Sequence, residues 1–247
     1  MIGRPNVSAE EIGTLIEKDQ VLSAKVLRLA NSPFYGFPSR IASVAHAVVV
    51  LGLNVVKGLT LCATAFDMMR NAGMNELWRH SLGVAMTAHI LGTNAAMKNP
   101  EEVFVAGLLH DIGKVVLYVK WPDVGQQITT VTRNTSRPLM DAEQELFEVT
   151  HADVGGWLAS AWHLPTSLRE PILHHHTPAA AQDAKLQTAI VHVADVLVKG
   201  LACGNPGDDL VPPLSRQAWD LVGLDAQSLA HCLTQATEEF QTIDDYL

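Results

Sequence analysis

The sequence is poor in cysteine and in aromatic residues, and both shortages limit the environment and the fold. Only three of its 247 residues are cysteines, at positions 62, 203 and 232, and an odd number of distant cysteines does not make a disulfide framework. We therefore expect a reducing compartment, the cytoplasm. Aromatic residues make up 6% of the chain, while Ala, Leu and Val dominate a hydrophobic content of 48%. This composition favours helices packed on helices, so the predicted fold class is all-α.

The sequence also lacks clustered positive charge and an uninterrupted apolar run. Its formal net charge of −9 argues against a nonspecific nucleic-acid groove, because neutralising phosphates requires clustered Lys and Arg. The N-terminus has no apolar signal core. The most membrane-like stretch, residues 44–66, is interrupted by Gly52, Asn54, Lys57 and Gly58, whereas a spanning helix needs roughly 20 predominantly apolar residues. We expect neither a nucleic-acid partner nor a membrane association.

Apolar periodicity, caps and breakers predict helices along nearly the whole chain. Ser8 and Glu11 form a capping box that opens a first helix, and a loop with two prolines and a glycine runs from Asn31 to Ser39. Later helices are predicted at 43–52, 55–70, 74–97 and 100–121, twice within 141–158, and at 187–200, 215–221 and 225–240.

Three tryptophans lie in these predicted helices or at their ends. No cluster of basic residues surrounds Trp78, Trp157 or Trp162 in the sequence, which argues against platforms for stacking nucleic-acid bases. We expect all three to be packing anchors.

The most informative feature is His110-Asp111, which lies inside the apolar run from Gly107 to Leu117. A buried imidazole or carboxylate without a partner costs several kcal/mol, whereas a divalent metal ion binds both groups. An arbitrary His-Asp pair on a helix more often faces solvent or a local hydrogen bond. Here further candidate ligands follow or precede in separate predicted helices: His80, His151, His175, His176 and Asp195.

Lys114 falls on the same side of the predicted helix as the pair, four residues after His110. A lysine there could hold a phosphate oxygen as a point charge, and the alternative is a solvated helix lysine. Three adjacent histidines fan over about 200° of a helix, so we prefer His175 and His176 as ligands over His174. The histidines at 46, 89, 163 and 192 are expected to be packing or surface residues.

Several segments resemble known families. Residues 107–114, Gly-Leu-Leu-His-Asp-Ile-Gly-Lys, resemble the signature of the HD phosphohydrolase superfamily. Residues 19–36 and 41–52 are similar to the N-terminal lobe of HDOD proteins, the HD-related output domains of bacterial signalling. The resemblance continues at 78–80, 143–147, 151–158, 162–165 and 175–178, and so covers nearly the whole chain.

This resemblance implies an all-helical output domain that works with signalling proteins such as receiver or cyclic-dinucleotide domains. The ligand pattern is also similar to that of the dinuclear HD-GYP phosphodiesterases. Carried over by position, one metal would be held by His80, His110, Asp111 and Asp195. Asp111 would bridge to a second metal held by His151, His175 and His176, and Asp111 and Lys114 would be the catalytic residues. Nitrogen and oxygen ligands without thiolates favour iron or manganese, with magnesium or zinc as alternatives.

The helix stop at Asn71-Ala-Gly73, together with the resemblance, divides the chain. Residues 1–72 are expected to form the N-terminal helical lobe, residues 73–202 an HD-like metal-binding helical core, and residues 203–247 the closing helices of the same unit. Residues 203–213, rich in Gly and Pro, form the predicted connector to those helices. The chain lacks the leading helix that usually precedes the segment matching Ser8 to Asp19, which indicates a truncated output domain.

Two functions remain open. Paired metals clamp a phosphate and activate water, the chemistry of phosphodiester hydrolysis, so the chain could be a phosphohydrolase acting on a small phosphorylated or cyclic-nucleotide ligand. After His176, however, the sequence reads Thr-Pro-Ala-Ala-Ala and lacks the Gly-Tyr-Pro loop of the HD-GYP type. The alternative is a noncatalytic interaction or ligand-sensing module in which the same polar cluster is structural.

Overall fold

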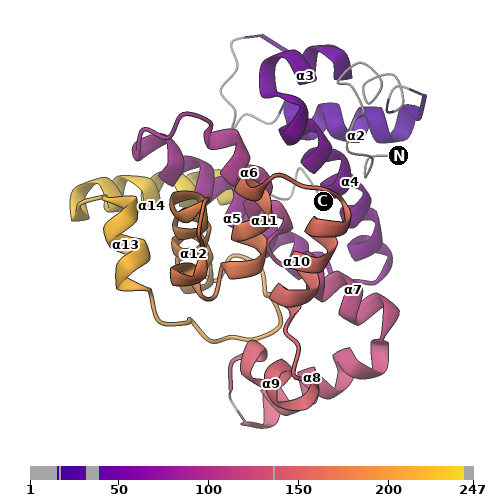
Figure 1. The fold of residues 1–247 in the computed structure, drawn as a ribbon, viewed down its shortest axis with the longest axis vertical. Helices are drawn as coiled ribbons and strands as arrows, with labels where there is room; N and C mark the ends of the chain where they lie inside the picture. Colours follow the sequence, from indigo (N-terminus) through magenta and orange to yellow (C-terminus); the bar gives the residue numbers. More distant parts are fainter. Residues whose placement is uncertain (1–15, 17, 32–38, 136, 242–247) are drawn as a thin grey trace.

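The computed structural model describes residues 16, 18–31, 39–135 and 137–241, and every regular element within them is a helix (Figure 1). The predicted all-α class is confirmed. The first predicted helix and most of the loop after Asn31 lie outside the described residues. In chain order, the helices are α2 (Gln20–Ala30), α3 (Val44–Leu51), α4 (Leu53–Asn71), α5 (Asn75–Asn94), α6 (Pro100–Leu109), α7 (Ile112–Lys120), α8 (Pro122–Thr135), α9 (Leu139–Phe147), α10 (His151–Ala161), α11 (Thr166–His174), the short 3-10 helix η2 (Pro178–Ala180), α12 (Lys185–Gly200), α13 (Arg216–Val222) and α14 (Ala226–Phe240).

Helices α2, α3 and α4 form the lobe at the top of Figure 1. Asp19 caps α2 and Ser43 caps α3, each by accepting hydrogen bonds from backbone N–H groups of the first turn. Gly52 separates α3 from α4, so the apolar stretch 44–66 is divided between two helices. Across the described chain, each helix falls short of the length and apolarity that crossing a membrane requires.

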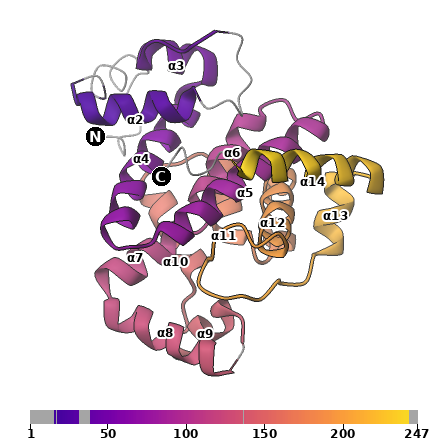
Figure 2. The ribbon, with the colours of Figure 1, turned by 180° about the vertical axis from the view of Figure 1, so that it is seen from behind.

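The other helices surround α5 and α6, which pack along each other (Figures 1 and 2). Helices α12 and α14 contact α5, while α11 contacts α6 and α10 contacts both α11 and α7. Helix α4 packs against α2 and α3 and also against α5, α6 and α7, and both lobes share one continuous apolar core. Helices α8 and α9 pair at the bottom of Figure 1, and the predicted connector crosses the molecule from α12 to α13 in Figure 2.

The His110-Asp111 pair lies in the turn between α6 and α7, so the single helix predicted over 100–121 is wrong. Asp111 has φ −98° and ψ 13°, away from α-helical values, and its carbonyl accepts a hydrogen bond from the Lys114 N–H at 2.9 Å. Consecutive side chains of a continuous helix point about 100° apart. The turn removes this constraint, and both side chains face the interior, where His110 is 0% and Asp111 1% exposed.

The prediction that all three tryptophans anchor the core is wrong for Trp157. Trp78 is buried and Trp162 packs against the core, but Trp157 is 61% exposed. Helix α10 buries His151, Gly155 and Ala159, which recur at four-residue intervals, and Trp157 falls on another face. There it lines an apolar groove of about 540 Å³ bordered by α7 to α10.

Helices α5 and α6 approach each other closely at Gly107. A Cβ atom added to Gly107 would lie 2.7 Å from Cα and 2.9 Å from N of Ala85, and these backbone atoms cannot move aside by changing a rotamer. The absence of a side chain at Gly107 therefore sets the spacing of two helices that lead to His80 and His110.

We predict that Gly107→Ala lowers the free energy of unfolding by about 2 kcal/mol, because the added methyl group pushes α6 away from α5. Gly200→Ala is the matched control. An added Cβ at Gly200, the last residue of α12, meets nothing within 4 Å, so this change should be neutral or stabilising by up to about 1 kcal/mol. Urea unfolding measures both variants, and equal destabilisation would contradict the close-contact argument.

Candidate metal centre

The seven candidate ligands come from five parts of the fold and meet in the interior. They are His80 on α5, His110 and Asp111 in the α6–α7 turn, His151 at the start of α10, His175 and His176 directly after α11, and Asp195 on α12. All are buried except His176, which is partly exposed. The structure thus brings every predicted metal ligand into one cluster that approaches the surface at His176.

Two aspartates and two histidines form the first group of this cluster. The Nε2 atom of His80 lies 3.0 Å from Oδ1 of Asp195 and 3.9 Å from Oδ2 of Asp111. The Nε2 atom of His110 lies 3.3 Å from Oδ2 of Asp111 and 3.9 Å from Oδ1 of Asp195. Ligand atoms that bind one ion at about 2 Å are themselves roughly 3 to 4 Å apart, so these distances fit a single metal ion.

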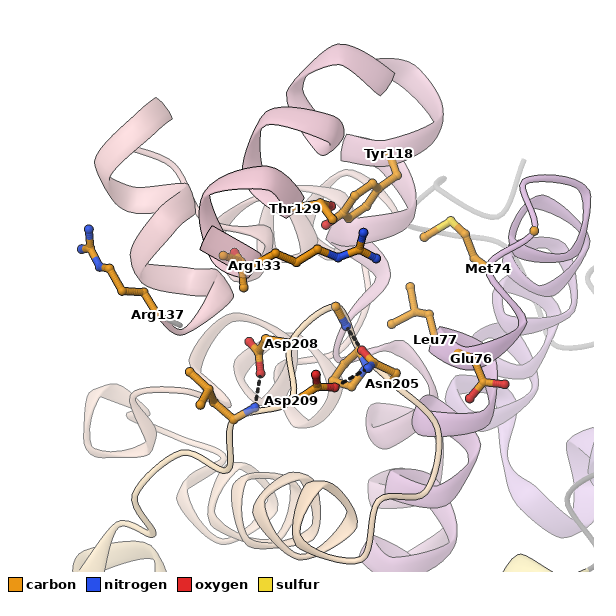
Figure 3. Close-up of a pocket in the computed structure, with 15 residues that line it drawn as sticks. Met74, Glu76, Leu77, Tyr118, Thr129, Arg133, Arg137, Asn205, Asp208 and Asp209 are labelled. Carbon is orange, nitrogen blue, oxygen red and sulfur yellow. Dashed lines mark hydrogen bonds between the residues drawn. The ribbon is translucent and has the colours of Figure 1, made fainter. Parts of the chain in front are cut away.

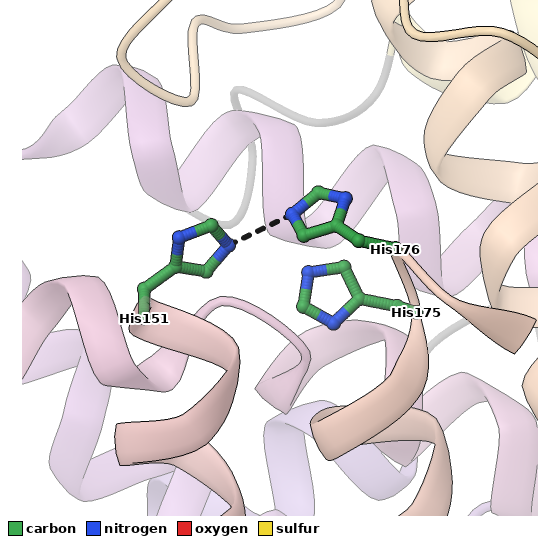
Figure 4. Close-up of side chains that lie close together, drawn as sticks. All are labelled: His151, His175 and His176. Atoms are coloured by element: carbon green, nitrogen blue, oxygen red, sulfur yellow. Dashed lines mark hydrogen bonds between the residues drawn. The ribbon is translucent and has the colours of Figure 1, made fainter. Parts of the chain in front are cut away.

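Three histidines form the second group (Figure 4). The Nε2 atoms of His151 and His176 are 2.9 Å apart, and both residues lie with His175 in one group whose ligand atoms are all within 4.8 Å. The Oδ1 atom of Asp111 is 3.2 Å from Nε2 of His151 and 3.7 Å from Nε2 of His175. Asp111 presents Oδ2 to the first group and Oδ1 to the second, which is the placement of a bridging carboxylate.

Several atoms at the centre of the cluster have no hydrogen-bond partner among the described residues. They are Nε2 of His80, His110 and His175 and Oδ1 of Asp111 and Asp195. The other ring nitrogen of His110 lies 2.7 Å from the carbonyl oxygen of Gly107, and that of His175 lies 2.9 Å from the carbonyl oxygen of Ile172. A ring nitrogen that bonds a carbonyl carries the proton, so Nε2 of both rings keeps its lone pair. Buried lone pairs without donors fit a metal cation.

Burial also sets the protonation state of the histidines. It lowers the pKa of His80, and it lowers the pKa values of His175 and His176 well below the usual imidazole range. These rings are therefore neutral at pH 7, which is the form that binds metal ions.

Lys114 is neither solvated nor free. Its side chain is 2% exposed, and Nζ donates a hydrogen bond to Oδ2 of Asp111 at 2.7 Å. Burial raises the pKa of the Asp111 carboxyl, but the adjacent His110 ring and the Lys114 ammonium outweigh burial and hold that pKa well below its usual range. Burial lowers the pKa of Lys114, and the carboxylate of Asp111 more than offsets this, so the ion pair is fully charged.

Glu143 holds His151 in place, although the sequence did not single it out as a site residue. Its Oε2 atom accepts a hydrogen bond from the His151 backbone N–H at 2.9 Å and lies 2.6 Å from Nδ1 of the ring. Burial lowers the pKa of His151, but the Glu143 carboxylate outweighs burial and raises it. The proton stays on Nδ1, and Nε2 faces the cluster. Glu143 follows Leu139 by four residues and so lies on the buried face of α9. A carboxylate at a position predicted to be buried could have identified Glu143 as a site residue from the sequence.

His192 supports the second group from outside, consistent with the expected packing role. Its Nδ1 atom lies 2.7 Å from the carbonyl oxygen of His175, and its Nε2 atom accepts a hydrogen bond from the Ser215 N–H at 3.0 Å. His192 therefore ties the turn that carries His175 to the end of the connector before α13.

The spacing between α7 and α10 depends on Gly113. A Cβ atom added there would lie 1.9 Å from the carbonyl oxygen of His151 and 2.9 Å from N of Gly155, both backbone atoms. The glycine within His110-Asp-Ile-Gly-Lys114 is thus the point at which α7 touches α10, and it brings Asp111 next to His151.

Comparison with known proteins agrees with this architecture. A sequence profile of the HDOD domain matches residues 1–178. The chain belongs to the HDOD family. The resemblance recognised in the sequence is therefore confirmed, and the matched region contains every candidate ligand except Asp195.

Two solved structures share the fold of this HDOD chain, and one curated protein is similar to it in sequence. An HDOD domain protein of unknown function from Geobacter sulfurreducens is 28% identical, with a TM-score of 0.76 and coverage of 100% of this chain and 89% of that one. A candidate phosphohydrolase from Shewanella amazonensis has the same fold at 22% identity, with a TM-score of 0.69 and coverage of 100% and 90%. An uncharacterized protein of Treponema pallidum is 26% identical over 215 residues, which are 85% of this chain and 42% of that protein. The HDOD chain thus spans less than half the length of this curated relative.

We predict that Glu143→Gln weakens the binding of one divalent ion by roughly 10- to 100-fold. The charged carboxylate accepts the Nδ1 proton of His151 and fixes the orientation of its ring, and a neutral amide holds the ring less firmly. Glu145→Gln is the control on the same helix, since Glu145 is exposed and, among the described residues, pairs with Arg137. Calorimetric titration with Mn²⁺ measures both affinities. Parent-like Mn²⁺ binding by the Glu143 variant would show that Glu143 does not position His151.

Proposed function

We propose that this HDOD chain is a signal-transduction output domain that binds two divalent metal ions and hydrolyses a phosphoester. The observation that carries the proposal is the set of buried, unpartnered imidazole nitrogens and carboxylate oxygens around Asp111. The proposal includes the division into residues 1–72, 73–202 and 203–247 and a cytoplasmic location, in keeping with three free cysteines.

In this proposal the two groups of ligands hold one ion each, with Asp111 shared. The first ion belongs to His80, His110, Asp111 and Asp195, and the second to Asp111, His151, His175 and His176. Iron and manganese are favoured by the nitrogen and oxygen ligands, with magnesium and zinc as alternatives. Paired ions, when bound, supply Lewis-acid stabilisation to a phosphate group.

The residues of the chain orient and charge this site. Asp111 fixes the separation of the two groups, and Lys114 donates to Asp111 and balances its charge. This contact supports a positioning role for Lys114 that acts through Asp111. His176, the partly exposed ligand, marks the side from which a phosphoester can approach the cluster.

The segment after His176 limits the substrate class. Residues 178–180 form η2, which packs against α11, α12 and α13, in the place where the HD-GYP type has its Gly-Tyr-Pro loop. We therefore propose a phosphodiester or phosphomonoester as substrate, without specificity for cyclic-di-GMP.

A noncatalytic function is the second candidate, and the burial of the cluster favours it. Six of the seven ligands are buried, and none of the seven lines the cleft of Figure 3. In this alternative the cluster stabilises the fold, and the domain serves signalling partners such as receiver or cyclic-dinucleotide domains through other surfaces.

The first test is metal content. Protein purified without chelators is expected to carry about two divalent ions per chain, and changing His175 and His176 together to Ala is expected to lower this to about one. His174→Ala alters a neighbouring histidine outside the ligand groups and should leave the stoichiometry unchanged. Elemental analysis gives the metal content, and circular dichroism verifies the fold. An unchanged stoichiometry in the double variant would reject the second ion.

The second test is activity. With Mn²⁺ or Fe²⁺ present, the protein is expected to cleave bis(p-nitrophenyl) phosphate slowly, and Asp111→Asn should abolish cleavage because an amide cannot bridge two cations. Asp123→Asn, which removes an exposed carboxylate from the first turn of α8, should leave the rate unchanged. Metal-loaded protein that is inert toward phosphodiesters and phosphomonoesters would reject hydrolysis and leave the noncatalytic function.

A further inference from the structure

A separate cleft lies where α5, α7 and α8 face the connector that follows α12 (Figure 3). Its volume is about 610 Å³, within the roughly 300 to 1,000 Å³ typical of small-molecule sites. The walls include Met74 and Leu77 at the start of α5, Tyr118 of α7, Arg133 of α8 and residues 205–210 of the connector.

The α8 wall offers hydrogen-bond donors that the described residues do not use. The Arg133 side chain extends into the cleft toward Tyr118, as Figure 3 shows, and it has no ion-pair partner in the described part of the chain. Thr132, which also lines the cleft, is 5% exposed, and its Oγ1 atom has no hydrogen-bond partner among the residues described. A buried hydroxyl without a partner is destabilising, so a ligand that bonds to it relieves that cost.

The acidic side chains of the connector, by contrast, already have partners. Asp208 accepts hydrogen bonds from two backbone N–H groups and pairs with Lys199 at 3.3 Å. Asp209 accepts a hydrogen bond from the Asn205 amide at 2.7 Å. Glu76 also lines the cleft, but Figure 3 shows its carboxylate far from Arg133. Arg133 is therefore the charged group that a ligand between Tyr118 and the connector can neutralise.

We propose that the cleft binds a small organic anion whose phosphate or carboxylate group bonds to Arg133 and Thr132. The planar guanidinium carries five donors and binds either kind of group in a bidentate geometry. The body of the ligand packs against Met74, Leu77 and the ring of Tyr118. An inorganic ion would leave most of the 610 Å³ unfilled, so the ligand has an organic part.

The cleft shares its supporting helices with the metal cluster, at a distance of one helical turn. Leu77 and His80 on α5 are three residues apart, and Tyr118 and Lys114 on α7 are four apart. On α12, Lys199 pairs with Asp208 of the cleft and lies four residues from Asp195. A ligand that orders the cleft therefore restrains three helices that position the cluster. Anion binding and metal binding should each raise the affinity of the other.

The test uses metal-loaded protein and four one-ring probes: phenylphosphonate, benzoate, benzyl alcohol and benzylamine. Calorimetric titration should show saturable binding of an anionic probe, with the neutral and cationic probes at least about tenfold weaker. Comparing phenylphosphonate with benzoate identifies the preferred anion. Absence of binding by both anions, or tighter binding of benzylamine, would overturn the proposal.

Variants locate the bound probe. Arg133→Gln should weaken anion binding by about tenfold or more, since a charged bidentate contact is lost. Arg137→Gln is the control, because Arg137 lines the same cleft but pairs with Glu145 and points away from the cavity in Figure 3. This control should bind the anion like the parent.

Thr132→Val separates binding from folding. Replacing an unpartnered hydroxyl by a methyl group of similar size should keep or raise the melting temperature of the free protein, while anion binding weakens. The proposal is overturned if Arg133→Gln binds the anion like the parent, or if binding is lost in the His175→Ala, His176→Ala double variant and kept in Arg133→Gln, because the anion would then lie at the metal cluster. The activity assays above have a different readout, so an inactive protein that binds the anion at Arg133 supports the cleft while rejecting hydrolysis.

Discussion

The buried carboxylate of Asp111 is the constraint around which this HDOD domain is organised. It is 1% exposed and stands between two groups of imidazoles, with Lys114 on Oδ2. An ionised carboxylate without compensation is among the most costly groups to bury, and removing one partner of a buried pair typically costs about 3 to 5 kcal/mol. Compensation has to come from several directions, and helices α5, α7, α10 and α12 and the turn after α11 each bring a charge or a ligand atom to the cluster. The helical arrangement and the polar cluster are therefore one structural solution.

Close helix contact is what allows so many ligands to share a small volume. At Gly113 the backbone of α7 touches that of α10, and at Gly107 the backbone of α6 touches that of α5. A side chain at either glycine would push the two helices apart. The ligand atoms, which lie 3 to 4 Å from one another, would then be too far apart to surround a single ion. The glycines on either side of His110-Asp111 thus act on geometry, whereas Glu143 and the backbone carbonyls select which ring nitrogen faces inward.

The sequence was sufficient for the fold class, the family and most helix boundaries, because these follow from local periodicity and from motifs such as Gly107 to Lys114. It could not show that α6 ends before His110, since the apolar pattern continues unbroken through the turn. The exposure of Trp157 was equally hidden, because burial depends on which face of α10 meets the core. Glu143 was missed because its importance rests on contact with His151, eight residues away, and that contact exists only once α9 and α10 are placed.

The cluster and the Arg133 cleft differ in how accessible they are to solvent. The ligands of the cluster are buried except for His176, which is partly exposed. An ion bound there would therefore exchange slowly with solvent, and its main effect would be on the stability of the fold. The cleft is open, and the Arg133 guanidinium that lines it has no ion-pair partner among the described residues, so an anion bound in the proposed site can exchange with solvent. Helices α5 and α7 each contribute residues to the cleft and to the cluster about one helical turn apart, and Lys199 of α12 pairs with Asp208 of the cleft. A ligand in the proposed anion site therefore restrains helices that position the cluster. This connection needs no large conformational change, since shifts of a few tenths of an ångström alter the ligand distances of the proposed metal site.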